Sequence, residues 1–262
     1  MDGEAIVASY ACGMSLTALA AKHGTNLHHI RKVLHVHGVP LRTRFEVARI
    51  REHNDVPLSS EMVQRIEGEL LGDGSVKPQK FQSFFSFRTS DRNYAEWLAG
   101  FFVDNGMPLI GQGVSTEQHV SFGTSCTAHS FRTISTVQLH AVRQRWYDSQ
   151  GRKHVPEDLE ISPLRVLHWW IGDGSVRGEC AGLLCTDAFA LDEQKLLSHK
   201  LNETANLRSH VVPWGSYYRI YIHSASMLDF LAYIGTAPFA TTAHKWNVRP
   251  PKRSAQSFKV SV

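Results

Sequence analysis

The chain has 262 residues, of which 42% are hydrophobic and 20% are charged, a composition typical of a globular protein rather than a disordered or fibrous one. The net charge of +4 gives weak support to a polyanionic partner. No segment approaches the ~18 apolar residues of a membrane span, and the four cysteines lack zinc-site spacing. We therefore expect an intracellular protein without a membrane anchor, a disulfide framework or structural zinc.

The first 45 residues predict a small helical module. Ser15 is a good N-cap for a helix from Leu16 to His23, residues 24–26 form a short turn, and a second helix runs from Leu27 to His37. Two short helices joined by a turn that contains glycine are typical of helix-turn-helix modules. The stretches that begin the first helix and follow the second also resemble resolvase-like members of that group. The alternative is a helical cap that packs on the rest of the protein.

The second of these helices predicts a DNA-contacting surface. Leu27, Ile30 and Leu34 recur at helical spacing and are expected to pack inward, which leaves polar and basic side chains exposed. Such side chains on a recognition helix contact bases and phosphates, and basic residues after the helix can follow the DNA backbone. The expected contact residues of the module are His28, Arg31, Lys32, His35, Arg42 and Arg44.

The sequence Gly-Asp-Gly-Ser-Val occurs at residues 72–76 and again at 172–176. A spacing of 100 residues (73 to 173) is too long for a solenoid and indicates a duplicated domain. After each copy the same elements follow in the same order: an amphipathic stretch (87–102 and 184–201), a strand-like alternation (119–124 and 217–223) and a helical stretch (near 128–145 and 225–235). Each half therefore predicts helix, strands, helix, strands, helix.

Each copy of this sequence lies at the end of an apolar helix. Ser60 and the pair Ser162-Pro163 are suitable helix N-termini, and the glycines are expected to end the helices in left-handed backbone conformations. Because the macrodipole disfavours an anion at a helix C-terminus, Asp73 and Asp173 need a compensating cation there. A single Asp-Gly pair is more often a simple turn, but a turn does not explain two copies at corresponding points of a duplicated chain.

Residues 58–248 resemble the LAGLIDADG homing endonucleases. Asp73 and the glycine after it correspond to the last two letters of the motif, and Gly68 corresponds to its third-position glycine. Residues 166–174 are similar to the second motif of single-chain members. The third position there is His168, so close packing of the two motif helices is less obvious on that side.

The resemblance implies an α+β fold with two pseudo-twofold-related αββαββα halves that form a DNA-binding saddle, preceded by a small all-α helix-turn-helix domain. We expect the helix-turn-helix module at 1–45, the first half at 46–150, and the second half, with the linker and the tail, at 151–262. The chain is then expected to act as a monomer on double-stranded DNA and to make a staggered double-strand break in a long target site.

The resemblance also implies a metal-dependent active site between the halves. Asp73 and Asp173 are expected to meet at the ends of the motif helices and, with the backbone carbonyls of Gly72 and Gly172, to bind Mg²⁺. Mn²⁺ is expected to substitute, and Ca²⁺ to support DNA binding without cleavage. The metals would activate water and stabilise the leaving oxygen of phosphodiester hydrolysis, with one active site per strand.

Two lysines correspond to basic residues near the active sites of the family. Residues 146–156 resemble the linker before the second motif and point to Lys153, with Arg152 as a competitor for the same role. Residues 239–246 resemble the matching segment of the second half and point to Lys245. Catalytic lysines would interact with the water network or the phosphate. The alternative for each is a cation that only binds the DNA backbone or faces water.

Strand alternation predicts the residues that face the DNA major groove. If Phe81, Phe85 and Phe87 face the helices, the polar side chains between them face the groove, and the same rule applies to the second half. The predicted base-reading residues are Gln82, Ser86, Arg88, Arg219, Tyr221 and His223, and the predicted phosphate contacts are Lys77, Lys80 and Arg177. The alternative is that some of these side chains simply face water.

Two other functions fit the same scaffold. A non-cleaving DNA-binding regulator has no use for two acidic residues that face a polyanion, so the presence of both aspartates favours an endonuclease. An RNA maturase would use the same saddle on intron RNA, and the sequence leaves this open as an additional activity. We therefore predict a DNA-associated, site-specific homing endonuclease.

Overall fold

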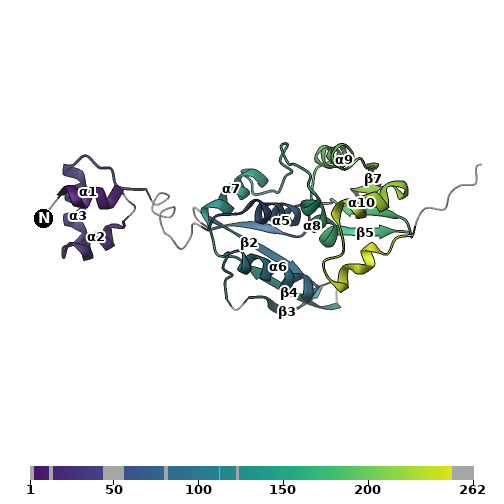
Figure 1. The fold of residues 1–262 in the computed structure, drawn as a ribbon, viewed down its shortest axis with the longest axis horizontal. Coiled ribbons are helices and arrows are strands. Elements are labelled where there is room, and N and C mark those ends of the chain that lie inside the picture. Colours follow the sequence, from purple (N-terminus) through teal and green to yellow (C-terminus); the bar gives the residue numbers. More distant parts are fainter. Residues whose placement is uncertain are drawn as a thin grey trace, which may run out of the picture.

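The computed structural model describes residues 3–11, 14–43, 56–79, 82–111, 113–121 and 124–249. Two predicted DNA contacts, Arg44 and Lys80, lie outside these residues, as does Phe81. Three short helices come first in the chain (Figure 1): α1 (Gly3–Ala11), α2 (Leu16–Lys22) and α3 (Leu27–Val36).

The three N-terminal helices share a hydrophobic cluster that is separate from the core of the body. Its buried members are Ile6, Tyr10, Leu19, Ala20, Ile30 and Leu34. The side chains of Ser15 and Asn26 cap α2 and α3, so both helices begin where the sequence predicts. Leu27 does not pack inward as predicted but is 40% exposed, because it is the first residue of α3 and no preceding turn covers it.

The body consists of two halves with the same order of elements. The first contains α5 (Ser60–Leu70), β1 (Ser75–Gln79), β2 (Gln82–Thr89), α6 (Arg92–Asp104), β3 (Ser115–Ser121), β4 (Thr124–Arg132) and α7 (Val137–Trp146). The second contains α8 (Pro163–Asp173), β5 (Gly174–Arg177), β6 (Ala181–Cys185), α9 (Leu191–Ala205), β7 (Ser209–Trp214), β8 (Tyr217–Ile222) and α10 (Met227–Ile234), followed by the 3-10 helix η3 (Ala240–Trp246). The predicted α+β fold with two αββαββα halves is confirmed.

Each half forms an antiparallel four-stranded sheet, with strand order β1-β2-β4-β3 in the first and β5-β6-β8-β7 in the second. The prediction of a helix near 128–145 is wrong at its start, because residues up to Arg132 belong to β4 and α7 begins only at Val137. Strand β4 is central and hydrogen-bonds to neighbours on both sides; Phe131, for example, pairs with Phe87 of β2. These long-range pairings, which local sequence does not reveal, determine the strand.

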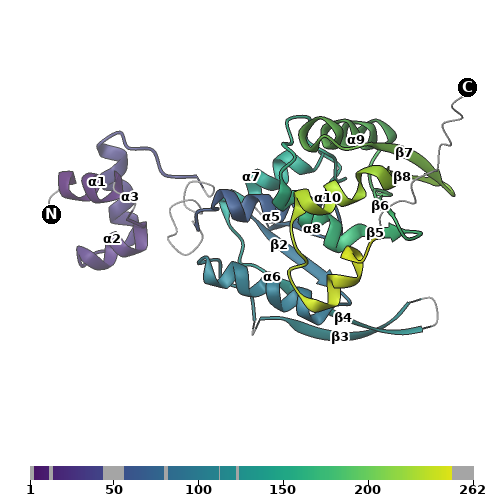
Figure 2. The ribbon, with the colours of Figure 1, turned by 45° about the vertical axis from the view of Figure 1, so that its right-hand side comes forward.

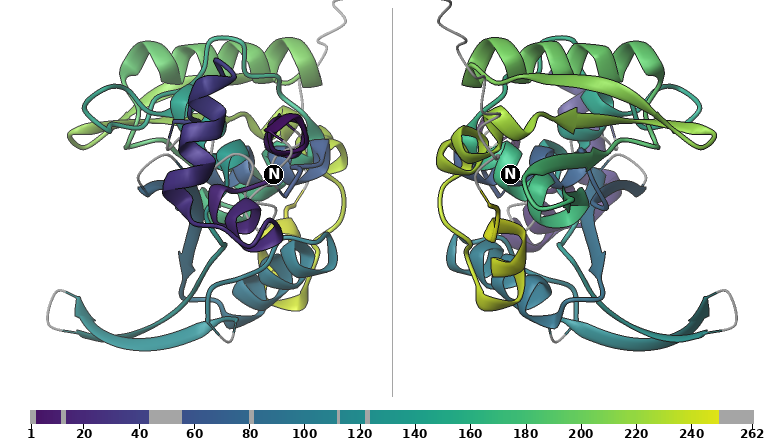
Figure 3. Two further views of the ribbon diagram at one scale, coloured as in Figure 1. Left: turned by 90° about the vertical axis from the view of Figure 1, so that its left-hand side faces the viewer. Right: turned by 90° about the vertical axis from the view of Figure 1, so that its right-hand side faces the viewer.

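The motif helices α5 and α8 lie side by side at the centre of the body (Figures 1 and 2). Helices α6 and α7 pack on the first sheet and α9 packs on the second, while α10 packs against α8. Figure 3 shows α9 along one side of the second sheet and the β3–β4 hairpin reaching beyond the helices. One hydrophobic core runs through both halves, and it includes Phe85 and Phe87 of β2, Trp169 and Trp170 of α8 and Ile220 of β8. Within the described ranges, no helix combines the length and apolarity needed to cross a bilayer.

Candidate active site and nucleic-acid interface

Both motif helices begin at serine caps. The Ser162 hydroxyl accepts a hydrogen bond from the backbone nitrogen of Arg165 at 3.3 Å, as predicted for the start of α8. Helix α5 begins one residue earlier than predicted, because Ser59 rather than Ser60 accepts a hydrogen bond from the backbone nitrogen of Met62 at 3.1 Å. The two adjacent serines offer equivalent caps, and the backbone is already helical at Ser60.

The motif helices meet at Gly68. A Cβ atom on Gly68 would lie 2.6 Å from the carbonyl oxygen of Arg165 and 2.7 Å from the Cβ atom of His168, so only glycine permits this approach. His168 is completely buried against this glycine. The histidine at the third position of the second motif therefore takes part in the close packing and does not prevent it.

The glycines after each motif are required by close neighbours, not by left-handed backbone. None of the glycines with positive φ in the described chain belongs to residues 72–76 or 172–176, so the predicted left-handed ends are wrong. A Cβ atom on Gly74 would lie 2.6 Å from the Cβ atom of Glu69, and one on Gly174 would lie 2.1 Å from the ring of Trp170. After each motif the backbone therefore turns back tightly against the helix that it has just left.

Asp73 and Asp173 come together at these helix ends. Asp73 lies in the turn after α5 and is exposed, whereas Asp173 is the last residue of α8 and is half-buried. A Cβ atom on Gly72 would lie 3.0 Å from the Oδ2 atom of Asp173, so this carboxylate lies against the other motif. Burial, and after it the charge of Asp73, raises the pKa of Asp173 to about 7.

Lys153 and Lys245 each donate hydrogen bonds to the last carbonyl groups of one motif. The Nζ atom of Lys153 lies 2.7 Å from the carbonyl oxygen of Gly72, and that of Lys245 lies 2.6 Å from the carbonyl of Ile171 and 3.5 Å from that of Gly172. Burial lowers the pKa of Lys153 to about 8, against the attraction of the nearby carboxylates, and it also lowers the pKa of Lys245. The lysines therefore offset the negative ends of the helix dipoles.

The donor atoms at this site are all oxygens. The carboxylates of Asp73 and Asp173 are oxygen ligands of the kind that Mg²⁺ and Ca²⁺ prefer, completed by water. The backbone carbonyls of Gly72 and Gly172 also face the lysines, and each carbonyl oxygen has a second lone pair for a metal. Across the part of the chain that the structure describes, no group of three His, Cys, Asp or Glu side chains is placed to hold a metal.

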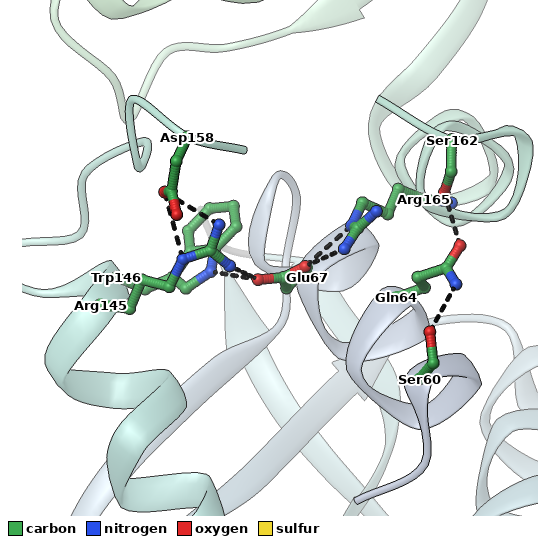
Figure 4. Close-up of polar contacts among 8 residues, drawn as sticks. All are labelled: Ser60, Gln64, Glu67, Arg145, Trp146, Asp158, Ser162 and Arg165. Carbon is green, nitrogen blue, oxygen red and sulfur yellow. Dashed lines mark hydrogen bonds and ion pairs between the residues drawn. The ribbon is translucent and has the colours of Figure 1, made fainter. Parts of the chain in front are cut away.

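Glu67 of α5 forms a buried ionic bridge to two other helices (Figure 4). Its carboxylate lies 2.7 Å from the guanidinium of Arg165 in α8 and also binds Arg145 and the indole nitrogen of Trp146 in α7. Arg145 in turn contacts Asp158 in the linker at 3.0 Å. One carboxylate thus holds the first motif helix to the second and to α7.

Glu69 is the centre of a second buried polar cluster. One carboxylate oxygen accepts hydrogen bonds from the Tyr94 hydroxyl and from the Nδ1 atom of His168, which lies 2.6 Å away, and the Nε2 atom of His168 accepts one from Arg65 at 3.1 Å. Burial raises the pKa of Glu69 and, with the charge of Arg65, lowers the pKa of His168. Because arginine can only donate, the Nε2 atom carries no proton and the ring proton lies on Nδ1, toward Glu69.

Sequence reasoning singled out neither of these clusters as part of the site. The available signal was the position of Glu67 and Glu69 among Ile66, Gly68 and Leu70 at the end of α5, since buried carboxylates need partners. One partner of each lies about 100 residues away in the second motif helix.

Comparison with known proteins agrees with this architecture. The sequence profile of the LAGLIDADG DNA endonuclease family matches residues 63–230, more than half of the chain. The chain belongs to this family. Residues of both motifs and both sheets fall within the match.

Proteins similar to this chain include a maturase, an uncharacterised protein and a homing endonuclease. The cytochrome b mRNA maturase bI2 of Debaryomyces hansenii is 29% identical over 185 residues, which cover 65% of this chain and 68% of the maturase. An uncharacterised protein of Methanocaldococcus jannaschii is 41% identical over 151 residues, which cover 55% of this chain and only 56% of that protein. The solved structure of the homing endonuclease I-WcaI bound to its DNA recognition sequence has a TM-score of 0.68 at 17% identity, and it covers 82% of this chain and 97% of that one. The last similarity shows a shared fold.

In this LAGLIDADG protein the first sheet carries one set of predicted contacts on its open face. Phe85 and Phe87 of β2 are buried toward the helices, whereas Gln82 and Ser86 are half-buried and Arg88 is exposed. Lys77 of β1 is exposed as well. Arg88 also approaches Glu117 of β3 at 4.0 Å, a weak surface pair that leaves its guanidinium accessible.

The second sheet carries the predicted DNA contacts of the second half, and several of these side chains interact with each other. Arg219 binds Asp187 with two hydrogen bonds of 2.9 and 2.8 Å, and both Arg219 and Arg177 lie over the ring of Trp214. His223 contacts His210 at 2.9 Å, and Tyr221 packs against both histidines. These side chains form an ordered polar surface.

The predicted contacts of the N-terminal module divide into two groups. His28, Arg31, Lys32 and His35 line an open cavity along α3, together with residues 39–41. Arg42 is half-buried, and its guanidinium lies 3.9 Å from the centre of the Tyr10 ring and donates to the carbonyl of Met14 at 3.0 Å. Arg42 therefore ties the chain after α3 to the first helix, while the α3 side chains remain open to a partner.

Proposed function

We propose that the protein is a site-specific DNA endonuclease and that Asp73 and Asp173 carry the reaction. The observation that supports this most directly is the convergence of two carboxylates, helix-end carbonyls and two lysines where the two halves meet. Two acidic groups beside surfaces rich in basic side chains would only weaken a protein whose sole task was to bind a polyanion. Hydrolysis of a phosphodiester would explain the presence of both acidic groups.

The proposed cofactor is Mg²⁺, with Mn²⁺ as a substitute and Ca²⁺ as an ion that supports binding without cleavage. Asp73, Asp173 and the carbonyls of Gly72 and Gly172 would hold it, and when bound it supplies an activated water and stabilises charge on the phosphate. The protein itself contributes a fixed set of oxygen ligands at a rigid helix contact. Lys153 and Lys245 offset the combined negative charge of the carboxylates and an incoming phosphate.

The two sheets are the proposed surface for double-stranded DNA, which a monomer would bind with one half on each part of a long site. The support comes from the second part of β2 and from β8, where Ser86, Arg88, Arg219 and Tyr221 alternate with the buried residues Phe85, Phe87, Ile220 and Ile222. The residues proposed to read bases are Gln82, Ser86, Arg88, Arg219, Tyr221 and His223, and Lys77, Lys80 and Arg177 are the proposed phosphate contacts. Double-strand cleavage would follow from one active site per strand.

The test is cleavage of a randomised DNA library in Mg²⁺, followed by sequencing of the cut ends and assay of single variants on the selected site. We expect Asp73→Asn and Asp173→Asn to abolish double-strand cleavage while DNA affinity in Ca²⁺ stays close to that of the unmodified protein. Asp104→Asn is the matched control, because Asp104 also ends a helix but lies at the exposed end of α6. Full cleavage by the variant that carries both active-site substitutions would refute the assignment.

A second proposed activity is binding of intron RNA to the same surface. It is supported by the similarity to the maturase of Debaryomyces hansenii over 68% of that protein's length. Maturase activity requires RNA binding but not phosphodiester hydrolysis by Asp73 and Asp173. RNA affinity and splicing that survive Asp73→Asn would support it, and absence of structured-RNA binding by the unmodified protein would exclude it.

The N-terminal module, residues 1–45, is proposed to bind DNA beside the main site. Its support is the face of α3 that bears His28, Arg31, Lys32 and His35, with the only described carboxylate of the module, Glu4, in α1. Arg42 and Arg44 were expected to follow the backbone, and of these Arg42 is already engaged with Tyr10. Deletion of residues 1–45 should weaken affinity and shorten the protected footprint. An unchanged footprint would leave the module with a structural role only.

A further inference from the structure

Among the polar contacts between α5 and α8 in the described residues, the pair Glu69–His168 lies closest in sequence to both aspartates. The two side chains are 1% and 0% exposed, and Nδ1 of His168 lies 2.6 Å from Oε1 of Glu69. A short hydrogen bond to a buried carboxylate depends steeply on geometry. Because each residue of a helix rises about 1.5 Å, a slip of one residue between the helices breaks this bond.

The rest of the cluster allows the pair only one arrangement. Arg65 donates to the Nε2 atom of His168 at 3.1 Å, which places the remaining ring proton on Nδ1, toward Glu69. The Tyr94 hydroxyl donates to the same oxygen of Glu69. On its face, the imidazole stacks on the Trp97 ring, with centroids 5.2 Å apart and planes 20° apart. Rotation or flipping of the ring would therefore leave a buried polar atom without its partner.

The same pair is linked directly to the aspartates through the backbone. The carbonyl oxygen of Glu69 accepts hydrogen bonds from the backbone nitrogens of Gly72 at 3.0 Å and Gly74 at 2.8 Å, so Glu69 holds the turn that contains Asp73. His168 lies in the helix that ends at Asp173, a little over one turn later. A displacement of either partner is therefore passed to a candidate metal ligand.

The two halves do not share this feature. With the same displacement of 100 residues that relates the aspartates, Glu69 corresponds to Trp169 in the second half. His168 corresponds to Gly68 in the first half. Trp169 is fully buried and its indole nitrogen has no partner among the described residues. The symmetry of the two halves therefore does not repeat this polar pair.

We propose that Glu69 and His168 are positioning residues that set the register of α5 against α8 and thereby the placement of Asp73 relative to Asp173. The consequence for cleavage rests on the proposed function, whereas the register itself does not. Glu67 provides a matched comparison, because it lies on the same helix, is 1% exposed and binds a cation of α8, but its carbonyl oxygen accepts from Leu71 and not from Gly72 or Gly74 on either side of Asp73.

The experiment compares Glu69→Leu with Glu67→Leu in the full-length protein, because leucine cannot accept the hydrogen bonds of either carboxylate. Both variants should lower the thermal midpoint. Below that midpoint, Glu69→Leu should slow single-turnover cleavage in Mg²⁺ by ~10- to 100-fold and weaken Mn²⁺ binding, measured by electron paramagnetic resonance, while DNA affinity in Ca²⁺ is kept. Glu67→Leu should reduce the cleavage rate and the Mn²⁺ affinity less than Glu69→Leu does, because the carbonyl of Glu67 does not bond to the residues on either side of Asp73. Equal losses in both variants, or an unchanged rate in Glu69→Leu, would overturn the positioning role.

A second variant and a crystal structure test the helix register even if the first variant does not fold or the protein does not cleave DNA. If Glu69→Leu does not fold, His168→Leu serves in its place, because it removes the same contact from the other helix. A crystal structure of the folded variant tests the register directly: α5 is expected to shift along α8, and unshifted helices contradict the proposal. Absence of cleavage and Mn²⁺ binding in the unmodified protein would instead refute the proposed function and leave the crystallographic test of the register valid.

Discussion

Substitution of Gly68 by alanine tests the helix contact on which the candidate active site depends. The added methyl carbon would lie 2.6 Å from the carbonyl oxygen of Arg165 and 2.7 Å from the Cβ atom of His168. Carbon atoms in favourable contact lie about 3.5–4.0 Å apart, and neither neighbour is the free end of a flexible side chain. The two helices must therefore separate by roughly 1 Å.

The expected change in the free energy of unfolding of Gly68→Ala follows from two opposing effects. Insertion of a methyl group into a tightly packed contact costs about 1–3 kcal/mol, and alanine gains up to about 1 kcal/mol over glycine inside a helix. The steric effect is larger, so we expect Gly68→Ala to reduce the free energy of unfolding by about 1–2 kcal/mol. For a protein of this size that corresponds to a fall in Tm of roughly 2–8 °C.

The assay is thermal unfolding followed by circular dichroism, with Gly100→Ala as the control. Gly100 lies within α6, and a Cβ atom there would meet no atom within 4 Å, so only the gain in helix propensity remains. The two alanine variants should therefore shift the midpoint in opposite directions. A Gly68→Ala protein as stable as the unmodified one, or shifts of equal sign, would refute the account of the contact.

Three further predictions concern the buried bridge, the aspartate pair and the N-terminal module. Glu67→Ala leaves Arg165 and the half-buried Arg145 without their shared carboxylate and should cost about 1–3 kcal/mol in urea unfolding, because water can reach both guanidinium groups; a midpoint unchanged from the parent would contradict the bridge. Because the pKa of Asp173 rises from 3.8 to about 7 on folding, the folded state holds its proton more tightly, and metal-free stability should fall as pH increases between these values. Asp173→Asn should flatten that part of the Tm–pH profile. A profile of unchanged slope would contradict the raised pKa of Asp173. The double substitution Arg31→Ala and Lys32→Ala should reduce the slope of log affinity against log salt by about 2 in fluorescence anisotropy, and an unaltered slope would exclude phosphate contacts.

The parts of the site that the sequence predicts are those repeated in it. Asp73 and Asp173 are identified because the same sequence recurs at a fixed spacing, and the family resemblance then indicates Lys153 and Lys245. All four lie together in the structure. Helix boundaries are similarly local, since a serine cap such as Ser162 is visible without knowledge of the fold.

The parts that the sequence does not predict depend on contacts between distant segments. Residues 124–132 contain small polar residues with no strong alternation, and they form a strand only because neighbours pair with both edges. The role of His168 is a similar case. From the sequence alone, a histidine in place of the motif glycine argues against tight packing. In the fold it packs on Gly68 and bonds to Glu69, and neither contact is encoded near it in the chain.

The two halves are similar where chemistry requires it and different where packing requires it. The proposed cleavage of both strands needs equivalent carboxylates, because the two strands of a duplex present equivalent phosphates, and the chain repeats Asp73 as Asp173. The helix contact has no such requirement once the halves are joined in one chain. There the first helix carries the acids Glu67 and Glu69, and the second carries Arg165 and His168 to receive them. Two identical helices would place an acid opposite a donor only if each helix carried both, whereas this division lets each buried acid meet a hydrogen-bond donor in one register. Covalent linkage of the halves therefore permits asymmetric motif helices around the symmetric reaction that we propose.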